Sequence, residues 1–180
     1  LGRFESEIIR KSWIPAFAGM TDGRKGNQEG RQTYIIKLMM KLKIKKLHPE
    51  AVLPKYATKG DAGMDLFAIE NVEILPMQRL QVATGIAMEI PEGYTGLIWD
   101  KSSLSHKFGL KTLGGVVDAG YRGEIKVGII NLGTEKYIFE KGHKVAQMII
   151  QACESIEILE VEELCCDTER GTGGFGSTGK

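Results

Sequence analysis

The chain has 180 residues, a length that suits a single domain with a core of its own, and its formal net charge is +1. A charge this close to zero gives no broad basic field that would suggest bulk nucleic-acid binding, so any anion-binding site must be local. No apolar run is long enough to cross a membrane, and an odd count of three cysteines is a poor disulfide framework, which favours a reducing compartment such as the cytoplasm.

The first 38 residues show no sustained helical or strand period. Residues 13–21 resemble peptides translated from repeated intergenic DNA of bacterial genomes, and a polar, glycine-rich stretch follows them. We therefore expect residues 1–38 to be either a spurious extension, with the true start at Met39 or Met40, or a disordered N-terminal arm.

From residue 39 onward, short runs with period-two alternation predict strands separated by turns. The expected strands lie at residues 41–47, within 61–68, and at 72–75, 80–90, 94–99, 124–131, 137–140, 144–151 and 155–161. A single short helix is expected at residues 104–108, with a serine cap before it and Gly109 at its end. This pattern predicts an all-β fold, a barrel or a jelly roll, over residues 39–168.

Residues 114–124 predict a β-hairpin with glycines at its corners. Val116 and Val117 run into Asp118, a turn follows, and Tyr121 comes after it, so a carboxylate and a phenol lie at the mouth of the hairpin. The glycines would allow a ligand to approach the backbone closely. Taken alone, the stretch is equally consistent with an ordinary hairpin that contains a turn aspartate.

The C-terminal residues 169–180 are too rich in glycine to hold a structure by themselves. A disordered terminus is the simpler interpretation. The alternative is a flexible lid that offers glycine amides and hydroxyls to phosphate oxygens, with Arg170 for charge and Phe175 as a stacking surface.

Five stretches in one order resemble the five motifs of the trimeric dUTP diphosphatase (dUTPase) family. They are residues 62–66, 101–104, 115–123, 142–147 and 170–179, and the third and fifth are the most specific. The resemblance covers residues 40–180. It implies a distorted jelly-roll subunit, a homotrimer with active sites at subunit interfaces, and a C-terminal lid that closes over a site built by other subunits.

The resemblance also implies a reaction, the hydrolysis of dUTP to dUMP and pyrophosphate. Water would attack the α-phosphorus while Mg²⁺ grips the triphosphate, and Asp118 would align and deprotonate this water. The magnesium ion would be held mainly by the substrate phosphates, and Asp65 would support the water molecules around the ion or a neighbouring polar network. Such an activity keeps uracil out of DNA and supplies dUMP for thymidylate synthesis.

The family's binding residues carry over to this chain position by position. The backbone around Gly115, Val116 and Val117 would read uracil, Tyr121 would lie under the deoxyribose, and Phe175 would stack on the base. The remaining substrate-binding positions, which hold mainly phosphate oxygens, are Lys101, Ser102, Ser103, Lys126, Gln147, Arg170, Gly176, Ser177 and Thr178.

The chain departs from the family pattern at several positions. Lys101 stands where arginine is usual, which keeps the charge but loses the bidentate geometry. His143-Lys144 replaces the usual Asp-Arg pair, and Thr112 occupies a position where many relatives have asparagine. Two alternatives remain open: a dCTP deaminase-like enzyme of the same fold, against which Asp118 and the glycine-rich tail argue, and a non-catalytic nucleotide-sensing trimer.

Overall fold

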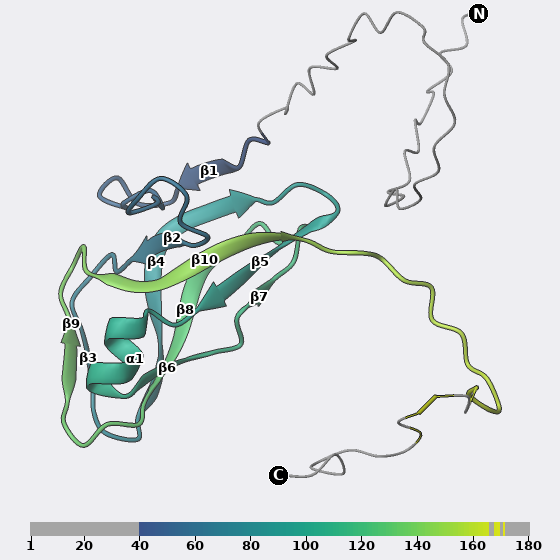
Figure 1. The fold of residues 1–180 in the computed structure, drawn as a ribbon. Coiled ribbons are helices and arrows are strands. Elements are labelled where there is room, and N and C mark those ends of the chain that lie inside the picture. The colour runs from purple at the N-terminus through teal and green to yellow at the C-terminus, as the bar shows by residue number, and fades with distance from the viewer. Residues whose placement is uncertain (1–39, 166–167, 170, 172–180) are drawn as a thin grey trace, which may run out of the picture. The chain divides into compact units, whose positions relative to one another are not determined.

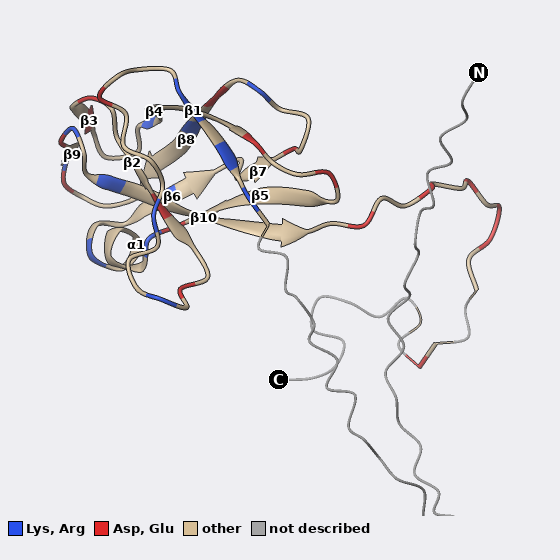
Figure 2. Ribbon diagram, turned by 90° about the horizontal axis from the view of Figure 1, so that it is seen from above, with Lys and Arg blue, Asp and Glu red and all other residues tan. Residues whose placement is uncertain are grey.

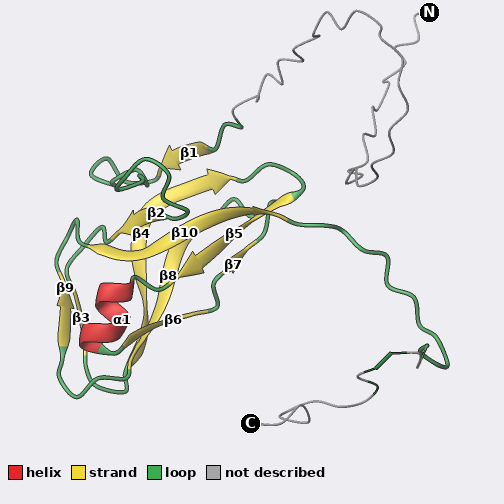
Figure 3. Ribbon diagram, viewed as in Figure 1, coloured by secondary structure: helices red, strands yellow, loops and turns green. Residues whose placement is uncertain are grey.

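The computed structural model describes residues 40–165, 168, 169 and 171. In these residues the chain forms ten strands and one short helix (Figures 1 and 3). The elements are β1 (Lys43–Lys46), β2 (Met64–Phe67), β3 (Val72–Ile74), β4 (Arg79–Glu89), β5 (Tyr94–Trp99), α1 (Ser102–Phe108), β6 (Leu110–Leu113), β7 (Val116–Val117), β8 (Glu124–Asn131), β9 (Tyr137–Phe139) and β10 (Lys144–Ala152). The all-β prediction with a single short helix is therefore confirmed, whereas the predictions for residues 1–38 lie outside the described part.

Two four-stranded antiparallel sheets make up most of the domain. Their strand orders are β1-β4-β8-β6 and β2-β10-β5-β7, and β3 pairs with β9 in a separate two-stranded ribbon. One core cluster takes buried side chains from both sheets, for example Val127 from β8 and Met148 from β10. The two sheets share one core, and neighbouring strands within each sheet are far apart in sequence. Both features are consistent with a jelly roll.

The strands follow the alternation of the sequence where one face meets the core. In β8, Ile125, Val127 and Ile129 are each at most 1% exposed, while the residues between them are more open to solvent. The pairing of β4 with β8 contains a register shift between Ala83 and Ala87. Gly85 lies inside this bulge with φ +69°, a left-handed conformation that glycine adopts without steric cost.

Helix α1 was predicted correctly in place but not in its cap. Ser102 already belongs to the helix, the N-cap is Lys101, and no side chain caps the first turn. At the other end Gly109 adopts φ 69° and closes the helix as expected. None of the described helices is long and apolar enough to span a bilayer.

The predicted strand at residues 155–161 is wrong. β10 ends at Ala152, and the chain beyond it forms no strand in the described residues up to 165. The apolar side chains that suggested a strand are open to solvent, with Ile156 81% and Ile158 94% exposed. The alternation is present, but the rest of the described chain gives it neither a pairing strand nor a core to cover.

The predicted hairpin at residues 114–124 is also wrong in its pairing. β7 pairs with β5, whereas β8 pairs with β4 and β6, so the stretch connects the two sheets instead of folding back on itself. The Ile98 amide donates to the carbonyl of Gly115 at 2.7 Å, and this bond starts the pairing with β5. The turn at Ala119 and Gly120 is present, since the Tyr121 amide donates to the Asp118 carbonyl at 3.1 Å.

Acidic and basic residues are interspersed over the sheets and their connections (Figure 2). This distribution fits a net charge close to zero. Charge at a binding site must then come from a few local side chains.

Candidate active site

A pocket of about 500 Å³ opens where β7 leads into β8. Its lining residues are Gln81, Ile98, Gly114, Val116, Val117, Asp118, Tyr121, Glu124, Ile125 and Lys126. The structure thus brings together the predicted catalytic aspartate, the two valines, the tyrosine and Lys126. We call this group the Asp118 pocket.

The Asp118 carboxylate is exposed at this pocket and makes no hydrogen bond or ion pair with another described side chain or amide. A free, solvated carboxylate can accept a proton from a water molecule beside it. The Tyr121 hydroxyl is held instead, because it donates to the Glu124 carbonyl at 3.0 Å. A Cβ at Gly123 would overlap the Tyr121 ring, so glycine at this position lets the ring fold back over the chain.

Gly115 makes a close approach, but to the protein's own backbone. A Cβ at this position would overlap the carbonyl oxygen of Ile98 on β5. Gly115 is absent from the lining of the Asp118 pocket, whereas Gly114, with φ 60°, takes part in it. The expected contact of the Gly115 backbone with a ligand therefore has no support in this pocket.

A second cluster surrounds Asp65, which is 3% exposed on β2. Lys101 Nζ lies 2.6 Å from Oδ1, and Lys144 Nζ lies 2.7 Å from Oδ2. Burial raises the pKa of this carboxyl, but the hydrogen bonds and charges of Lys101 and Lys144 outweigh burial and leave the pKa below its ordinary value. Asp65 is therefore ionised at neutral pH, and Lys101 is already engaged with it.

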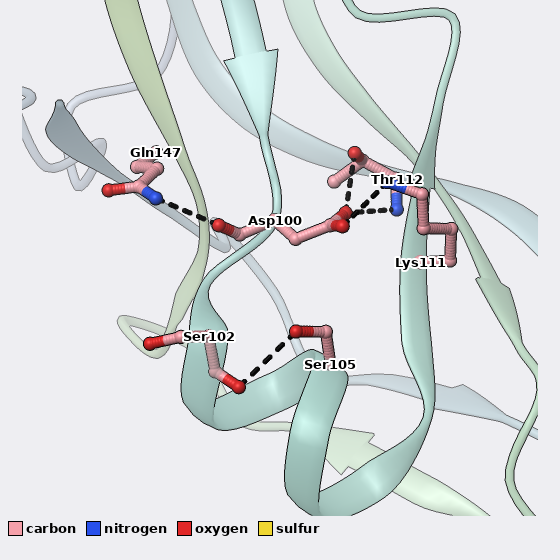
Figure 4. A network of polar contacts seen from close by, with 6 residues as sticks. All are labelled: Asp100, Ser102, Ser105, Lys111, Thr112 and Gln147. Carbon is pink, nitrogen blue, oxygen red and sulfur yellow. Dashed lines mark hydrogen bonds and ion pairs between the residues drawn. The ribbon is translucent and has the colours of Figure 1, made fainter. Parts of the chain in front are cut away.

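Gln147 belongs to the same region through the backbone that precedes α1. Its Nε2 donates to the Asp100 carbonyl at 2.8 Å (Figure 4). On β10 it pairs in register with Asp65 of β2 on one side and Trp99 of β5 on the other. We call residues 65, 101–103, 144 and 147 the Asp65 cluster; Ser102 and Ser103 are its exposed hydroxyls.

The two groups of predicted site residues do not share a pocket in one chain. No member of the Asp65 cluster lines the Asp118 pocket. The predicted lid residues Arg170, Phe175, Gly176, Ser177 and Thr178 lie outside the described residues. One subunit therefore presents its candidate site residues as two separate groups.

Sequence reasoning missed several residues of these groups. Glu124 lines the Asp118 pocket and fixes the β4 bulge, because its Oε1 accepts from the Gly85 amide at 2.8 Å. The period-two pattern of β8 was a usable signal, since it places Glu124 and Lys126 on the same face of the strand. Gln81, on β4, had no such signal, because only the pairing of β4 with β8 brings it to the pocket.

The described residues contain no group of three His, Cys, Asp or Glu side chains placed to hold a metal ion. Asp65 is a poor direct ligand, because two ammonium groups already occupy its oxygens. A divalent cation at this site would need oxygen ligands from another source, such as phosphates.

The sequence and the fold both match one family. The dUTPase family profile matches residues 49–179. The deoxyuridine 5'-triphosphate nucleotidohydrolase of Clostridium kluyveri is 51% identical over 142 residues, which cover 78% of this chain and 99% of that protein. The corresponding protein of Nautilia profundicola is 51% identical over 143 residues, which cover 78% of this chain and all of that one.

Solved structures of the same family agree. A Staphylococcus bacteriophage 80alpha dUTPase with dUpNHpp superposes with a TM-score of 0.74 at 32% identity, covering 78% of this chain and 99% of that one. A mutant dUTPase from phage phi11 of S. aureus, whose structure reveals the coordination of a structural Mg(II) ion, gives a TM-score of 0.66 at 29% identity over 69% of this chain and 98% of that one. The chain belongs to the dUTPase family.

Proposed function

We propose that this protein hydrolyses dUTP to dUMP and pyrophosphate. The observation that carries the proposal is the Asp118 pocket, where an exposed, unpaired carboxylate stands beside Tyr121 and the valines of β7 in a dUTPase fold. Water attacks the α-phosphorus, the bond from this phosphorus to the α–β bridging oxygen breaks, and pyrophosphate leaves. Asp118 takes the proton of the attacking water.

The Asp118 pocket is the proposed base and sugar site. The backbone of Val116 and Val117 would recognise uracil, and the ring of Tyr121 would lie against deoxyribose and leave no room for a 2′-hydroxyl. Lys126 lines the same pocket, where its Nζ lies 3.7 Å from Glu124 Oε2. Support also comes from the bacteriophage 80alpha structure, which holds the nucleotide dUpNHpp.

The Asp65 cluster is the proposed phosphate site. Ser102 and Ser103 would donate to phosphate oxygens and Gln147 would order the phosphate chain or the attacking water. Lys101 would contribute charge while it remains paired with Asp65. From the lid, Arg170, Ser177 and Thr178 would meet the terminal phosphate, with Gly176 as a backbone donor, and Phe175 would stack on uracil.

Magnesium is the proposed cofactor. When bound, the ion would neutralise charge on the triphosphate, and its ligands would be mainly phosphate oxygens. Asp65 would act on this site through Lys101 and Lys144, which its carboxylate holds in place.

A homotrimer is the proposed assembly, with each active site shared between subunits. Two features support it. The Asp118 pocket and the Asp65 cluster are separate in one chain, so a second subunit would have to complete each site. Residues 153–165 also carry exposed apolar side chains, such as Ile158 and Leu164, that a neighbouring subunit could cover.

The proposed place of action is the cytoplasm, where hydrolysis of dUTP limits uracil in DNA and provides dUMP. The support is the state of Cys153 and Cys165, which are free thiols and fit a reducing compartment.

The test is release of pyrophosphate from dUTP, dTTP, dCTP and UTP in the presence of Mg²⁺. Only dUTP should turn over rapidly. Asp118→Asn should bind dUTP but barely hydrolyse it. The matched control is Asp61→Asn, which changes an aspartate whose carboxylate accepts from the Thr58 amide, and it should keep full activity. Ammonia released from dCTP would replace the proposal with a deaminase, and tight dUTP binding without pyrophosphate release would leave a nucleotide sensor.

A further inference from the structure

Asp100 lies between the two groups of site residues and contacts the backbone that leads to each. It follows β5 directly and precedes Lys101, the N-cap of α1, and the first two helical residues; we call residues 101–103, at the start of the first helical turn, the 101–103 turn. Its side chain points away from this turn, toward β6, while its carbonyl points toward Gln147 on β10 (Figure 4). Asp100 is thus held from two sides, through its side chain and through its main chain.

The side-chain contacts of Asp100 are short and specific. Oδ1 accepts from both the amide and the hydroxyl of Thr112, each at 2.7 Å. Oδ2 pairs with Lys111 Nζ at 2.6 Å. Burial raises the pKa of this carboxyl, but the bonds from Lys111 and Thr112 outweigh burial and leave the pKa below its ordinary value, so all three bonds involve a carboxylate.

These contacts connect two stretches that the proposed reaction needs. On one side of Asp100, the Lys101 carbonyl accepts from the Leu104 and Ser105 amides and thereby starts α1. On the other side, Thr112 stands two residues before Gly114, the first residue of the Asp118 pocket along this part of the chain. A single carboxylate therefore fixes the backbone before the 101–103 turn to the backbone before β7.

We propose that Asp100 is a positioning residue that holds the 101–103 turn where it meets the triphosphate of the substrate. The proposal rests on the proposed function. Asp100 does not touch substrate; it acts through the serines of the turn. Serine hydroxyls and backbone amides are short donors, and their hydrogen bonds weaken steeply once distance or angle departs from the optimum. A small displacement of the turn would therefore weaken phosphate binding. The Asp118 pocket would keep its shape, because β6 stays paired with β8 and β7 stays paired with β5.

The experiment compares two nucleotides by calorimetry, dUpNHpp with three phosphate positions and dUMP with one. For Asp100→Ala we expect dUpNHpp to bind about tenfold more weakly, which is the loss typical of one hydrogen bond between the 101–103 turn and a charged phosphate. The affinity for dUMP should change by less than about twofold. In turnover, KM for dUTP should rise by about tenfold while kcat changes by less than about threefold, as expected when ground-state and transition-state binding are lost together.

Three variants keep the result interpretable. Asp100→Asn retains an oxygen for the Thr112 donors, and it should restore dUpNHpp affinity to within about threefold of wild type. Lys111→Met removes only the partly exposed ion pair and should have a smaller effect than Asp100→Ala. Asp61→Ala removes another aspartate that accepts from a backbone amide, here that of Thr58, and it should change the affinity for neither nucleotide.

If Asp100→Ala weakens the binding of dUpNHpp and dUMP equally, the proposal is overturned, because a general loss of structure would affect the phosphate contacts and the base contacts alike. Unchanged dUpNHpp affinity in the folded variant would overturn it too. If Asp100→Ala does not fold, Thr112→Val decides, since it removes only the hydroxyl bond and should weaken dUpNHpp selectively. A wild-type protein that neither binds dUpNHpp nor releases pyrophosphate from dUTP would instead refute the proposed function and this inference with it.

Discussion

The Asp118 pocket and the Asp65 cluster use their aspartates in opposite ways. In the pocket, the Asp118 carboxylate is exposed and has no described partner, and Tyr121 is 47% exposed. In the cluster, Asp65 is buried and holds two lysines, and the neighbouring Asp100 holds Lys111 and Thr112. The contrast separates groups that are free to react from groups that hold the backbone and its charges in place.

Loss of the lid tests whether these two regions suffice for catalysis. We expect deletion of residues 169–180 to abolish turnover of dUTP while the oligomer stays intact, because the proposed lid contacts substrate and not the core. Pyrophosphate release and light scattering measure the two properties. A truncated protein that dissociates would count against a lid, and one with full activity would place the whole site in the two described regions.

Asp118→Asn tests the aspartate that has no described partner. A general base typically contributes about 10²- to 10⁴-fold, so kcat should fall by that order. The melting temperature should not change, since the carboxylate has no described partner to lose. Calorimetry should still detect dUTP binding. A large loss of stability would show that Asp118 holds structure as Asp65 does.

Asp65→Asn tests the paired aspartate of the comparison. Hydrogen bonds to charged groups contribute about 1.5–3 kcal/mol, and the partial exposure of Lys101 and Lys144 reduces the effect, so we expect the free energy of unfolding to fall by about 2 kcal/mol. Denaturant titration measures this change. A variant as stable as the wild type would mean that the two lysines gain as much from water as from Asp65.

The pH dependence of stability should follow the same carboxylates. Asp65 and Asp100 have pKa values lowered from the model-compound value of 3.8, so they stabilise the fold above that pH. Their contribution is lost as the pH falls from about 3.8 through their lower folded-state pKa values. Melting temperatures from pH 7 to 2 should therefore fall steeply only at the acid end. Asp65→Asn should flatten this fall.

A surface ion pair provides the smallest expected effect. Lys136 Nζ lies 2.8 Å from Glu73 Oε2, and both side chains are about half exposed. Lys136→Met should change the free energy of unfolding by less than about 1 kcal/mol, as is usual for exposed pairs. An effect as large as that of Asp65→Asn would show that burial does not determine how much an ion pair of this protein stabilises the fold.

The sequence predicted the parts that depend on local pattern. The alternation of β8, the place of α1 and its end at Gly109 follow from residues close together in the chain. Half of the residues that line the Asp118 pocket were predicted as site residues, and these five lie within one short stretch: Val116, Val117, Asp118, Tyr121 and Lys126. Local pattern also misled, because residues 155–161 alternate like β8 yet have no described partner strand.

The Asp65 cluster shows what local pattern cannot supply. Lys101 lies 36 residues from Asp65, and only the pairing of β2 with β10 and of β10 with β5 brings the two together. The resemblance assigned Lys101 to phosphate, whereas the structure adds a buried carboxylate as its partner. The bonds of Asp100 were equally hidden, because they depend on the return of β6 beside the end of β5.

The open segment after β10 has a consequence for how the protein behaves on dilution. Ile156, Ile158 and Leu159 are covered by nothing in their own described chain, and apolar surface of this kind favours association. If another copy covers them, folding and assembly are linked by mass action, and the melting temperature should rise with protein concentration. The working stability of the protein would then be a property of how much of it the cell makes, and not of one chain alone.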